Sequence, residues 1–274
     1  MSNSAASGPI VYPYTCLSDG QTGQTDLVDE VPIAISYQGI SYAVMLVTPV
    51  NLDDFVFGFS LTNGVMNSTT DIVDWQLTPT PHGWLADVQL TARQANALGA
   101  HRQRLMGVSG CGLCGVDSLA TALPELQRLP DAAPPAASQL TNLREQLTEA
   151  QRLGQQTGAV HAAMLLNPQG QVLCVREDIG RHNALDKVLG YALRQNISLH
   201  NHMAVLSSRC SLELVQKAVR AGLSTLVHLA APSRLAVDCA RAHRLNLIHL
   251  TKHSGPRLYT RAHAGVSTLA SEPL

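Results

Sequence analysis

Residues 203–250 read MAVLSSRCSLELVQKAVRAGLSTLVHLAAPSRLAVDCARAHRLNLIHL, and this stretch decides the fold. Apolar runs at 203–207, 225–230 and 247–250 have the length of buried strands, and segments of helical pattern at 212–221 and 232–244 separate them. Strands that alternate with helices are typical of parallel pairing with helices packed on the sheet. The sequence therefore predicts an α/β fold with a mainly parallel sheet.

The residues before this stretch extend the pattern. We expect helices at 140–153 and 179–194, and strands at 162–166 and 171–175 around the turn Asn167-Pro168-Gln169-Gly170. The alternating part of the chain thus begins near residue 139.

The first hundred residues have a different pattern. β-rich segments at 31–37 and 41–47 flank Gln38-Gly39-Ile40, and a second pair lies at 72–77 and 84–90, so two antiparallel hairpins are expected. Asn51 is expected to be the N-cap of a helix over residues 52–62. A smaller antiparallel β-rich part is therefore predicted to precede the α/β part.

These patterns divide the chain into five segments. We expect a flexible N-terminal segment (1–27), a β-rich part (28–129), a linker rich in proline and alanine (130–138), an alternating α/β part (139–262) and a tail (263–274). No internal repeat is evident.

Composition excludes several classes of protein. The 274 residues are 45% hydrophobic with a formal net charge of −1, so no global positive field attracts nucleic acid or an anionic membrane. No apolar run reaches the ~18 residues of a membrane span, and no secretory signal precedes the first strand. Six cysteines in a chain of this length do not form a disulfide framework, and a reducing cytoplasm fits them best.

Polar residues follow successive strands at the edge where functional loops gather in such sheets. The four junctions are Arg176-Glu177-Asp178, Ser207-Ser208-Arg209, Ala231-Pro232-Ser233-Arg234 and Thr251-Lys252-His253-Ser254-Gly255. Helix N-termini and arginines favour an anionic, nucleotide-bearing ligand. The alternative is that the Asp178, Ser208, Ser211 and Ser233 side chains only cap helices.

The β-rich part carries a cysteine pair near its end, in Val108-Ser109-Gly110-Cys111-Gly112-Leu113-Cys114-Gly115. A helix is expected at 116–123, and a position just before a helix favours thiolate. Two such thiols can bind a metal, cycle as a disulfide or carry sulfur as a persulfide, and the pair alone does not choose among these chemistries.

The block Arg176-Glu177-Asp178-Ile179-Gly180-Arg181-His182-Asn183-Ala184-Leu185-Asp186-Lys187, together with the cysteine run, closely resembles the formate dehydrogenase accessory sulfurtransferase family, FdhD. Further blocks agree in order: Glu30-Val31-Pro32-Ile33-Ala34, residues 48–59, Ser207-Ser208-Arg209 and Ala231-Pro232-Ser233. The resemblance covers roughly residues 28–260.

This resemblance implies a sulfurtransferase. Family members take persulfide sulfur from a cysteine desulfurase and pass it to the molybdenum (or tungsten) bis(guanine dinucleotide) cofactor of formate dehydrogenase, which they bind transiently. Cys111 would carry the persulfide, and Cys114 would resolve or relay it. The resemblance also implies a homodimer and a sheet between helices similar to that of cytidine deaminases.

The resemblance places cofactor binding on Leu250, Thr251, Lys252, His253, Ser254 and Gly255. The family's segment usually opens with an aromatic residue and carries an arginine before a Tyr-Thr pair. Here Leu250 opens it, Arg257 comes later and Tyr259-Thr260 is retained.

The polar junctions add further candidates for the cofactor site, namely Arg181, His182, Asn183, Lys187, Ser207, Ser208 and Arg209. Alternatively, His182 with Asp186 and Asn183 with Lys187 are i,i+4 pairs that only stabilise their helix.

Three other functions remain open on the residues alone. The first is a zinc deaminase, although the nearest upstream histidine, His101, lacks the His-x-Glu pattern and no metal ligands are predicted. The second is a cofactor chaperone that transfers no sulfur. The third is a thioredoxin-like oxidoreductase, whose C-x-x-C should follow an early strand.

Overall fold

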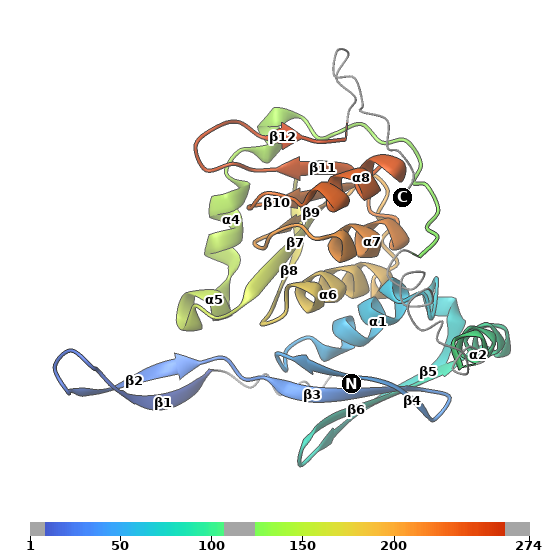
Figure 1. Cartoon of the computed structure of the whole chain (residues 1–274), viewed down its shortest axis with the longest axis horizontal. Helices are drawn as coiled ribbons and strands as arrows, with labels where there is room; N and C mark the ends of the chain where they lie inside the picture. Colours follow the sequence, from blue (N-terminus) through green and yellow to red (C-terminus); the bar gives the residue numbers. More distant parts are fainter. Residues whose placement is uncertain (1–8, 107–123, 261–274) are drawn as a thin grey trace.

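The computed structural model describes residues 9–106 and 124–260. In this part of the chain the strands form a two-stranded, a four-stranded and a six-stranded sheet (Figure 1). The first half contains β1 (Ile10–Thr15), β2 (Thr22–Leu27), β3 (Val31–Tyr37), β4 (Ile40–Val47), α1 (Leu52–Thr62), the 3₁₀ turn η1 (Thr69–Asp71), β5 (Ile72–Thr80), β6 (Gly83–Leu90) and α2 (Ala92–Met106).

The four-stranded sheet has the order β4-β3-β6-β5. Both predicted hairpins are confirmed, since β3 pairs with β4 and β5 with β6 in antiparallel fashion, while β3 and β6 are parallel. Helix α1 covers one face and packs Phe55, Val56 and Phe59 into the core. Asn51 is the N-cap residue of α1, as predicted, and its carbonyl oxygen accepts from Phe55 N (3.1 Å), although its backbone is left-handed (φ 54°) and its side chain makes no capping hydrogen bond.

The second half contains the six-stranded sheet. Its elements are the 3₁₀ turn η2 (Ala137–Leu140), α4 (Leu143–Ala150), α5 (Arg152–Thr157), β7 (His161–Leu166), β8 (Val172–Asp178), α6 (Arg181–Arg194), β9 (Met203–Leu206), α7 (Leu212–Arg220), β10 (Thr225–His228), α8 (Arg234–Ala242), β11 (Asn246–His249) and β12 (Arg257–Leu258). The predicted helix over 140–153 is broken, because α4 ends before Gln151 and α5 follows it.

The strand order is β12-β11-β10-β9-β7-β8. Only β9, β10 and β11 are parallel to one another, whereas β7 is antiparallel to both of its neighbours and β12 to β11. The prediction of a mainly parallel sheet is therefore wrong. The β7–β8 hairpin around residues 167–170 enters the same sheet, and its tight turn forces antiparallel pairing.

Helices cover both faces of this sheet. Helices α6, α7 and α8 pack on one face, where Leu165, Leu226 and Leu247 contribute to the core. On the other face Leu143 and Leu147 of α4 pack against Met164 and other residues of the sheet. The sheet thus lies between helices, as predicted; the further likeness to cytidine deaminases stays a prediction.

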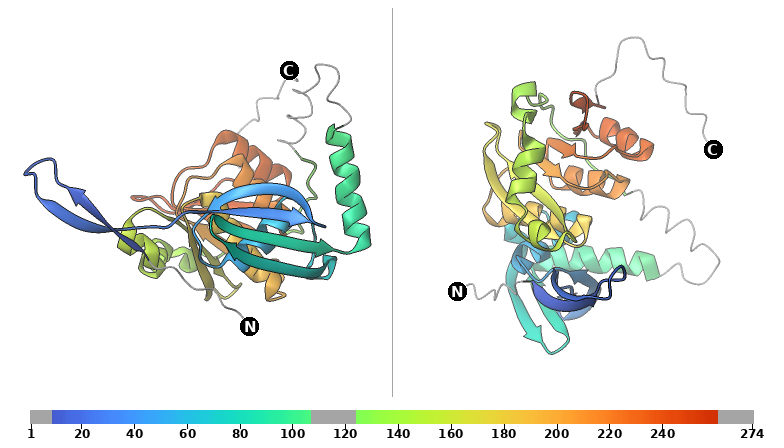
Figure 2. Two further views of the ribbon diagram at one scale, coloured as in Figure 1. Left: turned by 90° about the horizontal axis from the view of Figure 1, so that it is seen from below. Right: turned by 90° about the vertical axis from the view of Figure 1, so that its left-hand side faces the viewer.

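Strands β1 and β2 form a hairpin that extends away from the rest of the molecule (Figures 1 and 2). The sequence predicts only a flexible segment over residues 1–27, and the structure instead forms six register pairs from Ile10–Leu27 to Thr15–Thr22. We call residues 10–27 the arm.

Helices α1 and α6 join the two halves at a close crossing. A Cβ atom built on Gly58 would lie 1.8 Å from the carbonyl oxygen of Asp186, and one on Gly190 would lie 1.8 Å from that of Asp54. The two backbones therefore touch directly, and only glycine fits at either position. Such contact requires that neither helix carries a side chain at the crossing point.

We predict that Gly190→Ala destabilises the protein by at least ~1–3 kcal/mol, because the added methyl group forces the helices apart. Chemical denaturation measures this change. Gly99→Ala on α2 is the matched control, since nothing lies within 4 Å of the added carbon. Equal stabilities of the Gly190→Ala protein and the wild type would contradict the crossing.

Candidate functional site

Asp178 is the last residue of β8, and its hydrogen bonds connect the two halves of the chain next to the start of α6. Its carboxylate accepts hydrogen bonds from the backbone N–H groups of Gly180 (2.8 Å) and Thr48 (3.0 Å), and from Asn183 Nδ2 (2.9 Å). Asn183 also donates to the carbonyl oxygen of Leu46 (2.9 Å). The start of α6 is thus fixed to the strand-to-helix turn of the first half.

Lys187 completes this network. Its ammonium lies 2.7 Å from Asp178 Oδ2 and donates to the carbonyl oxygens of Thr48 and Glu177, and its side chain is 0% exposed. Lys187 and Asn183 were both predicted to bind a cofactor. The structure commits the Lys187 ammonium and the Asn183 amide nitrogen to internal contacts, so neither of these two donor groups is free to bind a ligand.

The predicted i,i+4 pairs on α6 do not form either. His182 Nε2 lies 2.8 Å from Glu213 Oε2 on α7, and Asp186 pairs at 2.7 Å with Lys217, which also belongs to α7. Helix α6 is therefore stabilised by its neighbours rather than along its own surface.

The junction Arg176–Asp178 was predicted to face a ligand, and it is internal instead. Arg176 Nε donates to Asp54 Oδ2 at 2.7 Å. The two carboxylate oxygens of Glu177 accept from the backbone N–H groups of Leu153 and Gly154 at the start of α5. The junction is thus the end of β8, and the side chains of Arg176 and Glu177 contact neighbouring elements rather than an open edge.

The carboxyl ends of the parallel strands form a polar edge. His228 ends β10 and His249 ends β11, and the two residues are register partners, so their side chains leave the sheet on the same face. Helices α6, α7 and α8 begin at this edge after Gly180, Ser211 and Ser233. Histidines therefore stand beside three helix N-termini, which are sites suited to anions.

Several buried polar atoms at this edge have no hydrogen-bond partner. They are Arg181 Nε, Ser211 Oγ, His228 Nε2, His249 Nδ1 and His182 Nε2, the last of which contacts Glu213 without hydrogen-bond alignment. Buried polar groups are almost always satisfied in native proteins, and clustered exceptions indicate a ligand or ordered water. Among the described residues, Thr91 Oγ1 is the one other such atom.

The predicted residues after β9 have mixed roles. Ser207 Oγ accepts from the backbone N–H of Ala162 (3.0 Å), and Ser208 Oγ donates to the carbonyl oxygen of Arg209 (3.1 Å). The Arg209 side chain is exposed. Ser233 is a helix cap, as the alternative interpretation holds, because its hydroxyl accepts from Ala236 N (3.2 Å). Arg209 is therefore the cation of this loop that a ligand can reach.

The predicted segment 250–255 follows β11 at the same edge. Leu250 is buried, whereas Lys252, His253, Ser254 and Gly255 are exposed. Ser254 N donates to Thr251 Oγ1 at 2.9 Å, which closes the segment into a turn. The structure thus brings this segment to the edge that carries Arg209.

Four residues of the edge were not predicted as site residues: Arg144, His161, His228 and His249. Arg144 reaches from α4 and donates to the carbonyl oxygens of Leu229 (3.1 Å) and Leu250 (2.7 Å). The sequence places a histidine at the end of each of two predicted strands, so His228 and His249 could have been predicted as residues of this edge. The contacts of Arg144 depend on the packing of α4 and could not be predicted from the sequence.

Burial keeps the histidines of this edge neutral. It lowers the pKa of His228 to about 4, although the carbonyl oxygen of Ser208 lies 3.3 Å from Nδ1. A carbonyl only accepts, so the neutral ring carries its proton on Nδ1 and leaves a lone pair on Nε2. The pKa of His249 is also lowered, by burial and then by Arg257 and Arg144. Positive charge at this edge therefore comes from arginine and lysine.

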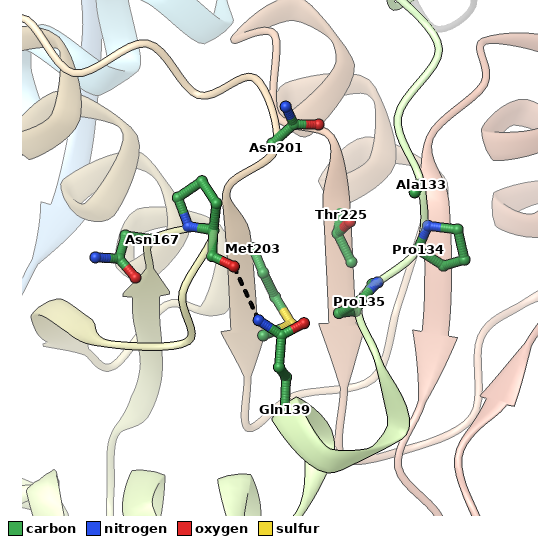
Figure 3. A pocket seen from close by; sticks show the side chains of 9 residues that line it. Ala133, Pro134, Pro135, Gln139, Asn167, Asn201, Met203 and Thr225 are labelled. Atoms are coloured by element: carbon green, nitrogen blue, oxygen red, sulfur yellow. Dashed lines mark hydrogen bonds between the residues drawn. The ribbon is translucent and has the colours of Figure 1, made fainter.

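A separate cavity of about 350 Å³ lies at the opposite edge of the sheet, where β9 and β10 begin (Figure 3). It is lined by Met203, Thr225, amides and three prolines, and Gln139 Nε2 donates to the carbonyl oxygen of Pro168 at 2.8 Å. No charged side chain lines it, so this cavity does not suit an anionic ligand.

Cys111 and Cys114 lie outside the described residues. Among the described cysteines, burial raises the pKa of Cys174 and of Cys210 to about 12, and it also raises that of Cys239. Such thiols are poor nucleophiles. Cys16, at the tip of the arm, differs, because a hydrogen bond with Ser18 lowers its pKa.

Within residues 9–106 and 124–260, no group of three or more histidine, cysteine or acidic side chains is placed to hold a metal ion. No described helix is both long and apolar enough to cross a membrane.

The fold and this edge define a class: an α/β protein with a cation-bearing polar site at the carboxyl ends of its parallel strands. The model of the FdhD/NarQ family matches residues 28–265. The chain belongs to the FdhD/NarQ family, as its motifs predicted.

Two relatives carry the name sulfur carrier protein FdhD. The protein from Bordetella petrii is 37% identical over 242 residues, which are 88% of this chain and 87% of the relative. That from Agrobacterium fabrum is 36% identical over 253 residues, which are 90% of this chain and 93% of the relative.

A solved structure shares the fold. The crystal structure of a Desulfotalea psychrophila protein assigned to formate dehydrogenase accessory proteins superposes with a TM-score of 0.72 at 23% identity. The match covers 92% of this chain and 97% of that one.

We predict that His228 makes stability depend on pH. Its folded pKa of about 4 lies below the unfolded value of ~6.5, so the unfolded state binds more protons between these values and stability falls as the pH is lowered through them. Between pH 7 and pH 5 the wild type should lose about 2 kcal/mol more unfolding free energy than His228→Gln. The exposed His253→Gln is the control and should follow the wild type. If the wild type and His228→Gln lose the same unfolding free energy between pH 7 and pH 5, burial does not hold this ring neutral.

Proposed function

We propose that this protein is a sulfur carrier that takes persulfide sulfur from a cysteine desulfurase and delivers it to the cofactor of formate dehydrogenase. Family membership carries the proposal, because relatives that cover most of this chain are named sulfur carrier protein FdhD. The high pKa values of the buried thiols support the assignment of the chemistry to the Cys111–Cys114 pair.

The first chemical step needs only a thiolate on this chain. The Cys111 thiolate attacks the outer sulfur of the donor persulfide, the donor's S–S bond breaks, a new S–S bond forms on Cys111, and the donor leaves as a thiolate. The step is an exchange that needs no external oxidant. Cys114 would resolve or relay the sulfur.

We further propose that the carboxyl edge binds the molybdenum (or tungsten) bis(guanine dinucleotide) cofactor as a transient ligand. Its phosphates suit the N-termini of α6, α7 and α8 and the exposed Arg209 and Lys252. The lone pair on His228 Nε2 can accept from an N–H or O–H donor of the ligand. Asn183 and Lys187 leave the proposed set, because their donor groups, the amide nitrogen and the ammonium, make internal contacts.

Substitution of the Cys111 thiol distinguishes a cofactor chaperone from a sulfur carrier. A protein that shelters the cofactor without moving sulfur would still support formate dehydrogenase after Cys111→Ala. The zinc alternative is tested by metal analysis of the purified protein, because its candidate thiols lie outside the described residues.

We predict that Cys111 accepts sulfane sulfur from a desulfurase supplied with cysteine. Mass spectrometry should show a gain of one sulfur on the wild type and on Cys114→Ser, and none at the pair in Cys111→Ser. Cys239→Ser is the matched control and should load normally. Loading and formate dehydrogenase activation that survive in Cys111→Ser would reassign the carrier.

We predict that GDP binds to the carboxyl edge. In calorimetry Arg209→Ala should weaken binding about 10-fold or more, because it removes a charge-assisted hydrogen bond. Arg244→Ala is the control, since Arg244 follows the end of α8 at the opposite edge and faces Asp131. Absence of GDP binding at millimolar ligand would remove the nucleotide site from the proposal.

A further inference from the structure

Leu229 and Leu250 are the residues at which two neighbouring parallel strands change into loops at the carboxyl edge. Leu229 follows β10, and Leu250 follows β11. Their backbone N–H groups still extend the parallel ladder, because each donates to a carbonyl oxygen of the neighbouring strand, at 3.1 Å from Leu229 and 2.8 Å from Leu250. The two loops of the edge, residues 229–233 and 250–255, therefore start from residues that belong to the sheet through their N–H groups.

Arg144 binds the carbonyl groups of these same two residues. It belongs to α4, on the face of the sheet opposite to α6, α7 and α8, and its Nη2 atom donates to Leu229 O (3.1 Å) and to Leu250 O (2.7 Å). One Nη2 group carries two hydrogens, so it can serve both carbonyl oxygens at once. A single guanidinium thus joins the starting points of two successive loops.

Packing holds α4 against the same two residues. Leu143 and Leu147 of α4 are buried in the cluster that also contains Leu250, and Leu229 packs against this cluster. The helix therefore contacts both loop residues through their side chains as well as through their carbonyl oxygens. The positions of the two loops depend on α4 in both ways, and the polar contact is made by Arg144.

The loops that Arg144 joins carry parts of the candidate site. The loop after β11 holds the exposed Lys252, and the loop after β10 ends at Ser233, the N-cap of α8. Ser233 N also donates at 3.1 Å to the carbonyl oxygen of Cys210, which follows Arg209 in the loop after β9. With Arg144, the three loops of the edge form one hydrogen-bonded set.

We propose that Arg144 is a positioning residue for anion binding: from the opposite face of the sheet, it holds the loops after β10 and β11 in the arrangement that receives the phosphates of the ligand. The inference rests on the proposed function, because it concerns the edge where the nucleotide part of the cofactor would bind. Loops that are ordered before the ligand arrives lose less freedom on binding, so the affinity depends on their support.

Two substitutions separate the donor groups of Arg144 from its stem. Arg144→Met keeps an apolar stem but has no N–H group, whereas Arg144→Lys keeps the charge and three N–H donors. Arg241→Met is the matched control, because Arg241 Nε also donates to a carbonyl oxygen, that of Tyr259, at 2.7 Å. Arg241 lies in the last turn of α8, away from the carboxyl edge at which this helix begins.

Calorimetry with GDP measures the effect on the ligand. We expect Arg144→Met to weaken GDP binding about 10-fold or more, because the carbonyl oxygens lose hydrogen bonds from a charged donor. Arg144→Lys should recover most of this loss, and Arg241→Met should bind GDP as the wild type does. Urea denaturation of the same proteins separates the two kinds of role, because a purely structural arginine lowers the unfolding free energy and leaves the Kd of the folded protein unchanged.

Hydrogen–deuterium exchange of the ligand-free proteins tests the positioning itself. In Arg144→Met we expect faster exchange at residues 229–233 and 250–255, and exchange like that of the wild type at residues 133–139 around the amino-edge cavity. An arginine that only contacts the ligand would also weaken GDP binding on removal, but it would leave the exchange of the ligand-free loops unchanged.

Two results would overturn the inference while the proposed function stands: a wild type and an Arg144→Met protein that bind GDP equally well, or weakened binding with unchanged exchange of both loops. A wild type that binds no GDP would instead remove the nucleotide site of the proposed function, and this inference with it. The behaviour of the wild type thereby distinguishes the two failures.

Discussion

The rest of the structure depends on the direct backbone contact between α1 and α6 at Gly58 and Gly190. Around it three aspartates that are nearly or fully buried meet cations from other elements: Asp54 with Arg176 and Arg194, Asp178 with Lys187, and Asp186 with Lys217. A buried carboxylate without its partner is strongly destabilising. The pairs of Asp54 with Arg176 and Arg194 join the first half to the second and so favour one arrangement of the two halves, whereas the other two pairs fix α6 within the second half. The crossing thus makes the β-rich part and the α/β part a single packed unit.

This junction also positions the candidate site. Asp178 fixes the backbone of Thr48 and of Gly180, and Gly180 is the residue from which α6 begins. The N-terminus of α6 is thereby held at the carboxyl edge beside those of α7 and α8. The block from Arg176 to Lys187 resembles the family motif, and the structure shows that much of it builds this support. Asn183 and Lys187 make internal contacts and His182 pairs with Glu213, while Arg181 Nε is buried without a hydrogen-bond partner.

Local patterns predicted the elements well, because their causes are local. The strands and helices between residues 203 and 250 lie within about two residues of their predicted bounds, and both hairpins of the first half are confirmed. Pairing between distant segments was less predictable. The local pattern of residues 161–178 does not indicate that this hairpin pairs with β9. That antiparallel pairing makes the sheet mixed. The arm was missed because its apolar residues contribute to no core.

The site residues also fall into those that local sequence could predict and those that depend on contacts between distant segments. Arg209 and residues 251–255 reach the predicted edge because a loop after a parallel strand must emerge there. Lys187 was misread because a lysine motif does not reveal that its ammonium is enclosed by Asp178, Thr48 and Glu177. His228 and His249 needed the register between β10 and β11, which brings them together on one face.

The central claim is that the carboxyl edge, with its unpartnered buried polar atoms, is where this protein holds its anionic ligand. Hydrogen–deuterium exchange with and without saturating GDP tests it most directly. The account predicts slower exchange at residues 207–211, 228–234 and 249–255, and unchanged exchange at residues 133–139 and 201–203 around the amino-edge cavity. Protection confined to the amino-edge cavity, or absent from the carboxyl edge at saturation, would contradict it.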